Sequence, residues 1–343
     1  MSYYSSLVHP LLRLGDGEAM HDRVLRALQI AQGNAVGRAI LRFFAGEIPE
    51  NPVDVFGLRF PNAIGVAAGF DKDARAVRGL SLLGFGHVEV GTLTPRPQAG
   101  NPKPRVFRLP EDRAVINRMG FPNGGAQRAA ERLRKFMSQP HNVIVGVSIG
   151  KQKETPLADA TGDYLAVLRE VHPFADYIAV NISSPNTPGL RELQGGRWLS
   201  GLCRDLVNES AALANGARRK PILVKIAPDL SDAELDEMLA AFLETGIDGV
   251  IATNTTLSRP ALRASHRDEQ GGLSGRPLAG RSTELIARIV KETGGRLPVI
   301  GVGGIFTAED AREKLDAGAR LVQVYTGMIY EGPGIAGKIL RGV

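Results

Sequence analysis

Cysteine is almost absent from this chain of 343 residues. The single copy, Cys203, excludes an internal disulfide framework and predicts a reducing compartment. Cys203 lies in a helical-looking stretch, residues 199–207, and we interpret it as a buried apolar thiol rather than a reactive one. Long apolar runs are missing too, since none approaches the roughly 20 residues that span a bilayer. The amino terminus lacks the apolar core and small-residue cleavage site of a secretory signal.

Clustered positive charge is a second absence. The formal net charge is +6, from 42 Lys and Arg against 36 Asp and Glu. A basic chain can bind nucleic acid or an anionic membrane. Here the basic residues are scattered, without a Lys/Arg block or a basic stripe interleaved with aromatic residues. We predict no nucleic-acid partner, and an anionic ligand or lipid surface explains the charge as well as RNA would.

Motifs for metal-dependent and nucleophilic hydrolysis are also missing. The histidines, at positions 9, 21, 87, 141, 172 and 266, are dispersed, and no HExxH motif or Cys/His cluster occurs. Neither a GxSxG elbow nor a GxxxxGKS phosphate loop is present. We predict no metal site and expect a bound organic cofactor to carry the chemistry.

What the chain does contain is a regular alternation of strand-length apolar runs with helical stretches. Strands are predicted near residues 63–67, 87–91, 143–149, 177–181, 222–226, 249–253, 298–302 and 321–325, after a short hairpin over 53–61. Helices are predicted over residues 123–137, 159–171, 232–244, 283–293 and 308–317. This order predicts an α/β fold, a (β/α)8 TIM barrel with an N-terminal helical extension. A doubly wound open sheet is the alternative, although informative residues after nearly every strand favour the barrel.

The first 45 residues differ from the rest, and we divide the chain into residues 1–45 and a barrel over residues 46–343. Apolar residues recur at helical spacing over residues 3–14, a Gly-Asp-Gly break follows, and a second helix is predicted over residues 18–32. Two short, mildly basic amphipathic helices suit shallow insertion into a membrane interface. A helical hairpin packed on the main domain fits this pattern equally well.

Polar residues and glycines gather where the predicted strands end, which is where barrels bind ligands. The loop over residues 181–194 is longer than a turn needs and carries serine, asparagine and proline. Lys225 lies inside an apolar run; because an unpaired buried ammonium is costly, we expect it to have a fixed anionic or carbonyl partner. GVGG at 301–304, YTG at 325–327 and a helix start near Thr307 predict a phosphate site.

These features together fit FMN, which has one phosphate and a flat ring. The small residues 67–69 let the backbone approach a flat ligand, and Lys72 follows them. A lysine at the pyrimidine edge of the ring would stabilise negative charge on reduction. The substrate would then lie on the flavin face, near Ser184.

The assembled motifs closely resemble dihydroorotate dehydrogenase, in its class 2, quinone-linked and membrane-associated branch. The resemblance covers nearly the whole chain. It is carried by AAGFDKDA (67–74), GTLTPRPQAGNPKPRVFRL (91–109), INRMGFPNGG (116–125), NISSPNTPGLRELQ (181–194), VKIAPDL (224–230), TNTT (253–256), GGLSGRPL (271–278), GVGGI (301–305) and YTGMIY (325–330).

The resemblance implies oxidation of (S)-dihydroorotate to orotate in de novo pyrimidine (UMP) biosynthesis, through one FMN per chain. Ser184 matches the class 2 catalytic base, where class 1 enzymes use cysteine. It would remove the C5 proton while C6 delivers hydride to flavin N5. A serine is a weak base at its free pKa and needs help, from a water relay or a loop closed over a dry site. Residues 190–194 would form the closing part of that loop.

The same matching assigns ligand-binding residues. Orotate or dihydroorotate would be held by Lys72, Asn117, Asn181, Asn186, Asn254 and Thr255, together with the backbone of Arg118, Met119, Gly120 and Phe121. FMN would be held by Ala68, Gly69, Lys72, Thr92, Ser148, Asn181, Lys225, Thr253, Gly275, Gly304, Tyr325 and Thr326. Ser148 departs from the asparagine usual in the family, so we expect it to be a weaker FMN contact, acting through water.

For the N-terminal helices, the resemblance implies a membrane-docked pair that encloses a quinone tunnel. His21, Arg108 and Tyr325 match residues at its inner end. The resemblance predicts a monomeric peripheral protein on the cytoplasmic face of the cell membrane, with a membrane quinone as electron acceptor. The alternatives are a class 1 enzyme using fumarate or NAD, another FMN barrel such as a tRNA dihydrouridine synthase, and a non-catalytic flavin- or phosphate-binding barrel.

Overall fold

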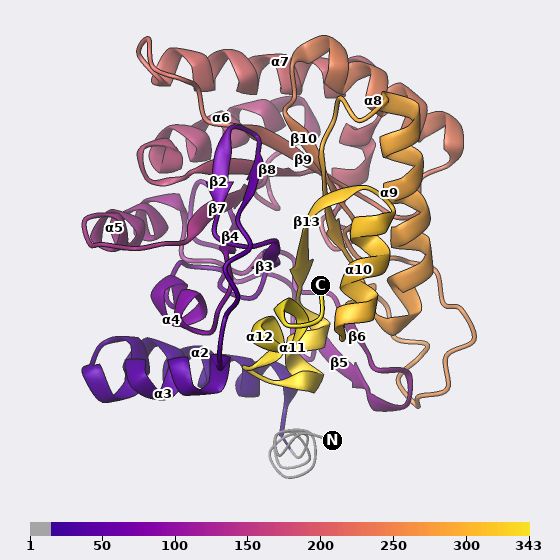
Figure 1. The fold of residues 1–343 in the computed structure, drawn as a ribbon. Helices are drawn as coiled ribbons and strands as arrows, with labels where there is room; N and C mark the ends of the chain where they lie inside the picture. Colours follow the sequence, from indigo (N-terminus) through magenta and orange to yellow (C-terminus); the bar gives the residue numbers. More distant parts are fainter. Residues whose placement is uncertain (1–14) are drawn as a thin grey trace.

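Eight parallel strands close into a barrel in the computed structural model, which describes residues 15–343 apart from the side chains of residues 196 and 197. The strands are β3 (Ile64–Val66), β4 (His87–Leu93), β7 (Ile144–Ile149), β8 (Tyr177–Asn181), β9 (Ile222–Ile226), β10 (Gly249–Ala252), β12 (Val299–Val302) and β13 (Ala319–Val324). They follow one another around the barrel in chain order, and β13 pairs with β3 to close it (Figure 1). The predicted (β/α)8 barrel is confirmed, and the open-sheet alternative is wrong.

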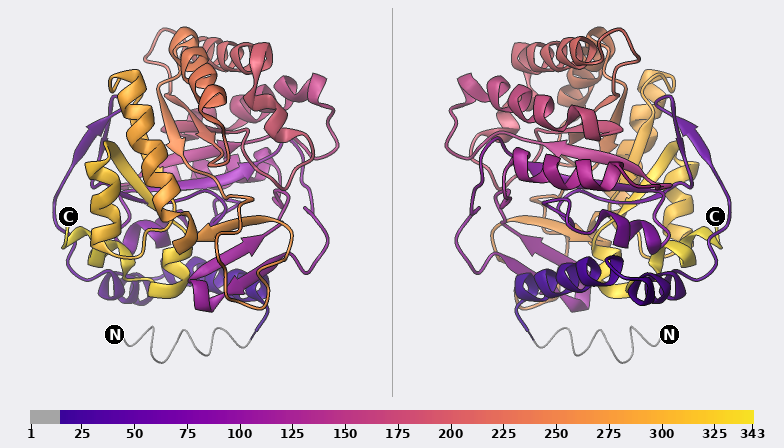
Figure 2. Two further views of the ribbon diagram at one scale, coloured as in Figure 1. Left: turned by 90° about the vertical axis from the view of Figure 1, so that its right-hand side faces the viewer. Right: turned by 90° about the vertical axis from the view of Figure 1, so that its left-hand side faces the viewer.

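Helices follow the barrel strands and surround them (Figure 2). They are α4 (Val77–Leu82), α5 (Ala126–Met137), α6 (Ala160–Val171), α7 (Gly196–Leu213), α8 (Asp232–Thr245), α9 (Ala279–Thr293), α10 (Ala308–Asp316), α11 (Thr326–Glu331) and α12 (Ile335–Leu340). The predicted helices lie within a few residues of these bounds. Cys203, on α7, is 1% exposed, and burial raises the pKa of its thiol to about 12. This agrees with an unreactive apolar thiol.

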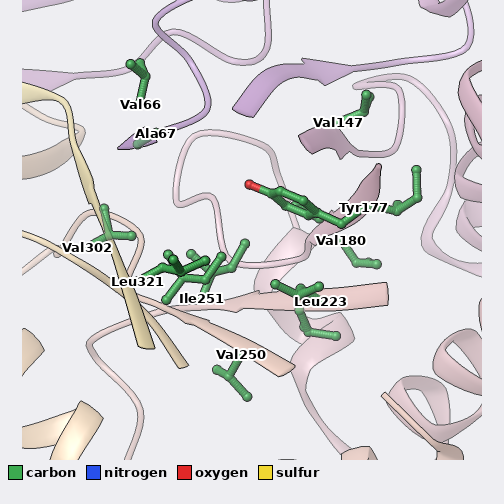
Figure 3. Close-up of a cluster of buried hydrophobic side chains, with 14 of the residues drawn as sticks. Val66, Ala67, Val147, Tyr177, Val180, Leu223, Val250, Ile251, Val302 and Leu321 are labelled. Carbon is green, nitrogen blue, oxygen red and sulfur yellow. The ribbon is translucent and has the colours of Figure 1, made fainter. Parts of the chain in front are cut away.

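The barrel strands are buried on both faces, which explains why they appear in the sequence as nearly unbroken apolar runs. Figure 3 shows part of this core, with Tyr177, Leu223, Ile251 and Leu321 among its members. The predicted hairpin is present as β1 (Val53–Val55) and β2 (Leu58–Phe60). Its Phe60 ring meets the buried His87 ring edge-on, with the two ring centroids 5.4 Å apart. The hairpin therefore covers the barrel at the end where the strands begin.

A second, three-stranded antiparallel sheet lies outside the barrel and was not expected. It consists of β5 (Val106–Leu109), β6 (Ala114–Asn117) and β11 (Gly272–Gly275), with β6 in the middle. Phe107, Leu109, Ile116 and Leu273 form a small core of their own beneath it. Since β11 comes from the loop after β10, this sheet joins two barrel loops that are far apart in sequence.

The N-terminal extension forms two helices, α2 (Gly17–Gln32) and α3 (Ala35–Ala45). They lie together at one end of the molecule, near β5 and α12 (Figures 1 and 2). Asp16 and Asn34 cap their first turns. The helix predicted over residues 3–14 lies outside the described residues. One face carries exposed apolar side chains, namely Ile30, Val36, Ile40, Phe43 and Phe44. Among the described residues, no helix combines the length and apolar character needed to cross a bilayer.

A buried ion pair attaches α2 to the rest of the protein. Arg105 donates to both carboxylate oxygens of Glu18, at 2.9 Å from Nε and 2.6 Å from Nη2. Glu18 and Arg105 are each less than 10% exposed to solvent. Arg105 Nη1 also donates to the carbonyl oxygens of Ala99 and Asn101. The bond from Arg105 outweighs burial and lowers the pKa of Glu18 below its ordinary value of 4.5.

We expect Arg105→Met to cost about 3 kcal/mol, because it removes the buried partner of the Glu18 carboxylate and leaves only the exposed Lys103, 3.3 Å away. In the wild type this stabilisation is fully present above pH 4.5, the ordinary value for Glu18, and is lost as the pH falls through the lowered folded value. Urea unfolding at pH 7 and pH 3 measures both effects. Arg59→Met, which removes a pair exposed by more than two thirds on each side chain, is the control and should change stability by less than about 1 kcal/mol. Equal effects of the two variants would contradict the assignment.

Candidate active site

The loops at the carboxyl ends of the barrel strands surround a cavity that opens to solvent, with about 1030 Å³ of space when its open mouth is included. Nineteen of the residues predicted to bind substrate or cofactor line it. They are Ala68, Gly69, Lys72, Thr92, Asn117, Met119, Gly120, Phe121, Asn181, Ser184, Asn186, Lys225, Thr253, Asn254, Thr255, Gly275, Gly304, Tyr325 and Thr326. The barrel thus brings together residues that are up to about 260 positions apart in the sequence.

Side-chain amides form two hydrogen-bonded groups in the wall of the cavity. Asn181, the last residue of β8, donates through Nδ2 to Thr92 Oγ1 at 2.8 Å. Asn254 donates to Asn181 Oδ1 at 3.3 Å and to Ser183 Oγ at 3.1 Å. Asn186 donates to Asn117 Oδ1 at 3.4 Å. Amides supply both donors and acceptors, so this wall suits a ring that carries carbonyl and N–H groups.

The loop after β8 is fixed from several directions. Ser184 is 5% exposed, and its Oγ accepts a hydrogen bond from Asn186 N at 3.3 Å. Arg191 donates to Ser183 O and Thr255 O, both at 3.1 Å, and pairs with Asp229 at 2.8 Å. Asn186 O accepts from Asn101 Nδ2 at 3.1 Å. Ser184 is therefore held facing the cavity by contacts outside its own loop.

The segment expected to close over the site has a different environment. Residues Leu190–Gln194 form a 3-10 helix, and Leu190 and Leu193 are buried in the main core. Gln194 Oε1 accepts from Ala227 N at 3.1 Å. In this structure the segment is packed against the barrel, and the loop residues that line the cavity are Ser184 and Asn186.

Lys225 extends from β9 into the cavity and is 5% exposed. Among the described residues, no acceptor lies within hydrogen-bond distance of its Nζ. Burial lowers the pKa of Lys225, and the Glu89 carboxylate opposes that change. By contrast, the buried Lys314 has protein partners, Ala279 O at 3.0 Å and Thr283 Oγ1 at 2.8 Å. The ammonium of Lys225 is thus available to a ligand in the cavity.

Lys72 lies at the rim nearest the N-terminal helices. Its Nζ donates to Gly69 O at 2.7 Å, and burial lowers the pKa of the ammonium. His21, on α2, is a close neighbour: burial, with the charge of Lys72, lowers the pKa of His21 to about 3. The rings of His21 and Phe70 are 5.0 Å apart, and those of Phe70 and Tyr325 are 6.0 Å apart. A row of aromatic contacts therefore joins α2 to the cavity.

The glycine-rich end of the cavity is formed by Gly303, Gly304, Thr326 and Gly327. Gly304 has φ +73°, and an added Cβ would lie 2.4 Å from Ala279 Cβ, so the turn requires glycine. At the start of α10, Asp310 accepts hydrogen bonds from Phe306 N and Thr307 N, so these two donors, which lie where the sequence predicted an anion site, are already occupied. The helix start that borders the cavity is that of α11, which no side chain caps. Backbone donors here suit a phosphate.

Four predicted site residues do not line the cavity. Ser148 is fully buried, with Oγ 2.9 Å from Oγ1 of the cavity residue Thr92, and its contact with FMN stays a prediction. Arg118 turns away to pair with Glu269 at 2.7 Å and to cover the Phe107 ring. His21 lies behind Phe70. Arg108, on β5, donates to Gly15 O beside α2.

Other cavity residues were not singled out in the sequence. Three of them are Ser274, directly before Gly275; Leu278, three positions after it; and Gln323, one residue before the end of β13. A polar residue inside the apolar run 321–324 was a usable signal for Gln323. The structural roles of Asn101 and Arg191 had no such signal, because both depend on contacts between separate loops.

Comparisons with known proteins identify the family of this chain. A model of the dihydroorotate dehydrogenase family matches residues 52–343. A protein named dihydroorotate dehydrogenase (quinone) from Roseiflexus sp. (strain RS-1) is 50% identical, over 100% of this chain and 94% of its own. One of the same name from Idiomarina loihiensis is 48% identical, over 98% of each chain. A crystal structure of DHODH from Eimeria tenella, in complex with ferulenol, has a TM-score of 0.81 and 40% identity, over 89% of both chains. This chain belongs to the dihydroorotate dehydrogenase family, in its quinone-dependent branch.

Proposed function

We propose that this protein oxidises (S)-dihydroorotate to orotate in de novo pyrimidine biosynthesis, with FMN as cofactor and a membrane quinone as electron acceptor. The observation that carries the proposal is the single cavity in which Ser184, an amide wall, Lys225 and a glycine-rich turn face one another. The names of the relatives support the substrate and the acceptor.

The residues present fit FMN. Lys225 is a buried ammonium without a protein acceptor among the described residues, and such a group requires a polar ligand partner. Gly304, Thr326 and Gly327 border the end suited to the phosphate, and Thr92, Asn181 and Thr253 lie between that end and Ser184 in our assignment. When bound there, FMN would supply the hydride acceptor for C6 of the substrate. Lys225 would hold the polar edge of the ring and Lys72 the substrate carboxylate.

Ser184 is our candidate for the group that takes the C5 proton. Its Oγ is buried and accepts only a weak hydrogen bond from Asn186 N, at 3.3 Å. The amides of Asn117, Asn186 and Asn254 would fix the substrate ring so that its C5 proton faces this oxygen. With cofactor and substrate bound, the cavity would exclude bulk water and so limit competing proton exchange.

Anaerobic mixing tests the activity. Purified protein should show the yellow flavin absorbance, which should bleach on addition of dihydroorotate. Reoxidation with ubiquinone, menaquinone, fumarate and NAD⁺ in separate arms identifies the acceptor. Fast recovery with a quinone alone supports the proposal, and fast recovery with fumarate or NAD⁺ would indicate class 1 behaviour. Bound flavin that dihydroorotate does not bleach would indicate a non-catalytic binding barrel.

We propose that residues 1–45 dock on the membrane and guide the quinone toward His21, Arg108 and Tyr325. The exposed apolar face of α2 and α3, with Arg38 and Arg42 nearby in sequence, supports this role. The protein would then be a monomer bound peripherally on the cytoplasmic face of the cell membrane. The aromatic row from His21 to Tyr325 would connect the quinone position with the flavin position.

The double variant Phe43→Glu, Phe44→Glu should reduce binding to anionic vesicles by at least about tenfold, since each burial of a phenylalanine contributes about 1.5–3 kcal/mol. Phe43 is 83% exposed and Phe44 52%, so the fold should not change. Co-sedimentation with phosphatidylglycerol vesicles measures binding. Leu213→Glu, on the exposed end of α7, is the control and should bind as the wild type does. Undiminished binding of the double variant would refute the docking face.

A further inference from the structure

The barrel interior contains a buried carboxylate that the proposed chemistry does not use. Glu89, on β4, is 0% exposed. Its Oε2 accepts from Tyr177 OH at 3.0 Å and from Gln323 Nε2 at 3.0 Å, and Gln323 also lies 3.3 Å from Tyr177 OH. These three residues, from β4, β8 and β13, form what we call the interior cluster. No arginine or lysine contacts it among the described residues.

The interior cluster lies next to the floor of the cavity. Gln323 belongs to both, since it bonds Glu89 and lines the cavity together with Lys225. Within the interior cluster, Glu89 Oε1 and Gln323 Oε1 are shielded from solvent and have no partner among the described residues. Lys225, whose Nζ has no acceptor among the described residues, lines the adjoining cavity. A buried carboxylate and a buried ammonium, each without a contact partner of opposite charge, thus occupy adjoining parts of one interior.

Other ionisable groups around Lys225 do not compensate its charge. Lys72, at the rim, carries the same sign. Tyr177 and Tyr325 are phenols whose pKa burial raises, that of Tyr325 to about 12, so both stay neutral. The two strands beside β9 contribute only uncharged residues at this level: β8 ends at Asn181, and Thr253 follows β10. Glu89 is the acidic group whose charge counters the effect of burial on Lys225.

We infer that Glu89 is a positioning residue for Lys225: its carboxylate keeps the ammonium charged inside the barrel and reduces the positive field that reaches the cofactor. The inference rests on the proposed function, because the field matters only if FMN lies against Lys225. Interior charges in a low dielectric interact over longer distances than exposed ones. The interior cluster therefore adjusts how strongly the site favours reduced over oxidised flavin, without touching the flavin or the substrate.

Glu89→Gln tests this with nearly unchanged shape, because the amide of Gln323 can turn to present its free oxygen to the new side chain. At pH 6, the affinity for reduced FMN relative to oxidised FMN should rise about tenfold. For a two-electron couple this raises the midpoint potential by about 30 mV. Tyr177→Phe is the matched control: it removes one bond to Glu89 but no charge, so the potential should stay as in the wild type. An unchanged or lower potential in Glu89→Gln, or equal shifts in both variants, overturns the inference.

A second measurement does not depend on FMN. In protein labelled with ¹⁵N-lysine, the titration of Lys225 Nζ should move to lower pH in Glu89→Gln, by about tenfold in proton affinity, and should stay in place in Tyr177→Phe. An unmoved titration overturns the inference, whether or not flavin is bound. Wild-type protein that binds no FMN but shows the Lys225 shift would refute the proposed function alone. If Glu89→Gln does not fold, the wild type decides: Lys225 that loses its proton between pH 6 and 8 overturns the inference.

Discussion

Ser184→Ala should slow reduction of the bound flavin by dihydroorotate by roughly 10²- to 10⁴-fold, the usual contribution of a positioned general base. The change removes the one hydroxyl that our assignment places at the C5 proton. Since Ser184 Oγ accepts only a 3.3 Å bond from Asn186 N, its loss should hardly affect stability. Stopped-flow absorbance under anaerobic conditions measures the reduction rate directly, apart from the quinone step.

Two comparisons make the Ser184 result specific. Ser231→Ala removes a helix-capping hydroxyl at the start of α8 from a residue that does not line the cavity. It should lower stability by about 1 kcal/mol and leave flavin reduction unchanged. Substrate binding to Ser184→Ala, followed by the spectral shift of oxidised flavin, should stay within a few-fold of the wild type. A normal reduction rate in Ser184→Ala would show that another group accepts the proton.

Lys225→Met should release FMN, with a dissociation constant raised roughly 10- to 150-fold, which corresponds to the loss of one hydrogen bond to a charged group. The physical reason is that Lys225 Nζ has no acceptor among the described residues, so its bond with the ligand is not shared with the protein. Fluorescence of free flavin after dilution reports the release.

Lys314→Met is the matched control, because Lys314 is also buried but donates to Ala279 O and Thr283 Oγ1. Its replacement should lower the free energy of unfolding and leave FMN affinity close to the wild-type value. If both lysine variants lost FMN equally, the loss would reflect disturbed packing, and Lys225 would not be a direct FMN contact.

The barrel could be predicted because each of its strands and helices leaves its own pattern in a short stretch of the sequence. Each strand buried on both faces gives a short apolar run, and each helix after it gives a period near 3.6. The placement of Asn181, Lys225 and Asn254 then followed, since each lies at or near the end of such a run. Within one kind of fold, the position at the strand end determines which side chains face the site.

Features that depend on contacts between loops could not be predicted this way. In the small sheet, β11 pairs with β6, which lies over 150 residues earlier in the sequence. The first residue of β11, Gly272, gives no strand signal. Glycine is required there because an added Cβ would lie 1.9 Å from Thr255 Oγ1. The sequence predicted an anion site at the start of α10, but the Asp310 side chain caps this helix and competes with an anion for the same N–H groups. Arg118 turned outward for Glu269, a partner that no local pattern indicates.

The pairing of β3 with β13 has a consequence for synthesis of the chain on the ribosome. Val66 pairs with Val324, which follows it by 258 positions in the sequence. The barrel cannot close until Val324 has been translated, which at 5–20 residues per second takes roughly 13 to 52 s after Val66. Through most of that interval α3 and its two phenylalanines have already left the exit tunnel. The nascent chain thus exposes the apolar side chains of α3 before the barrel has closed. We expect the yield of folded protein in cells to depend on chaperones that bind exposed apolar segments.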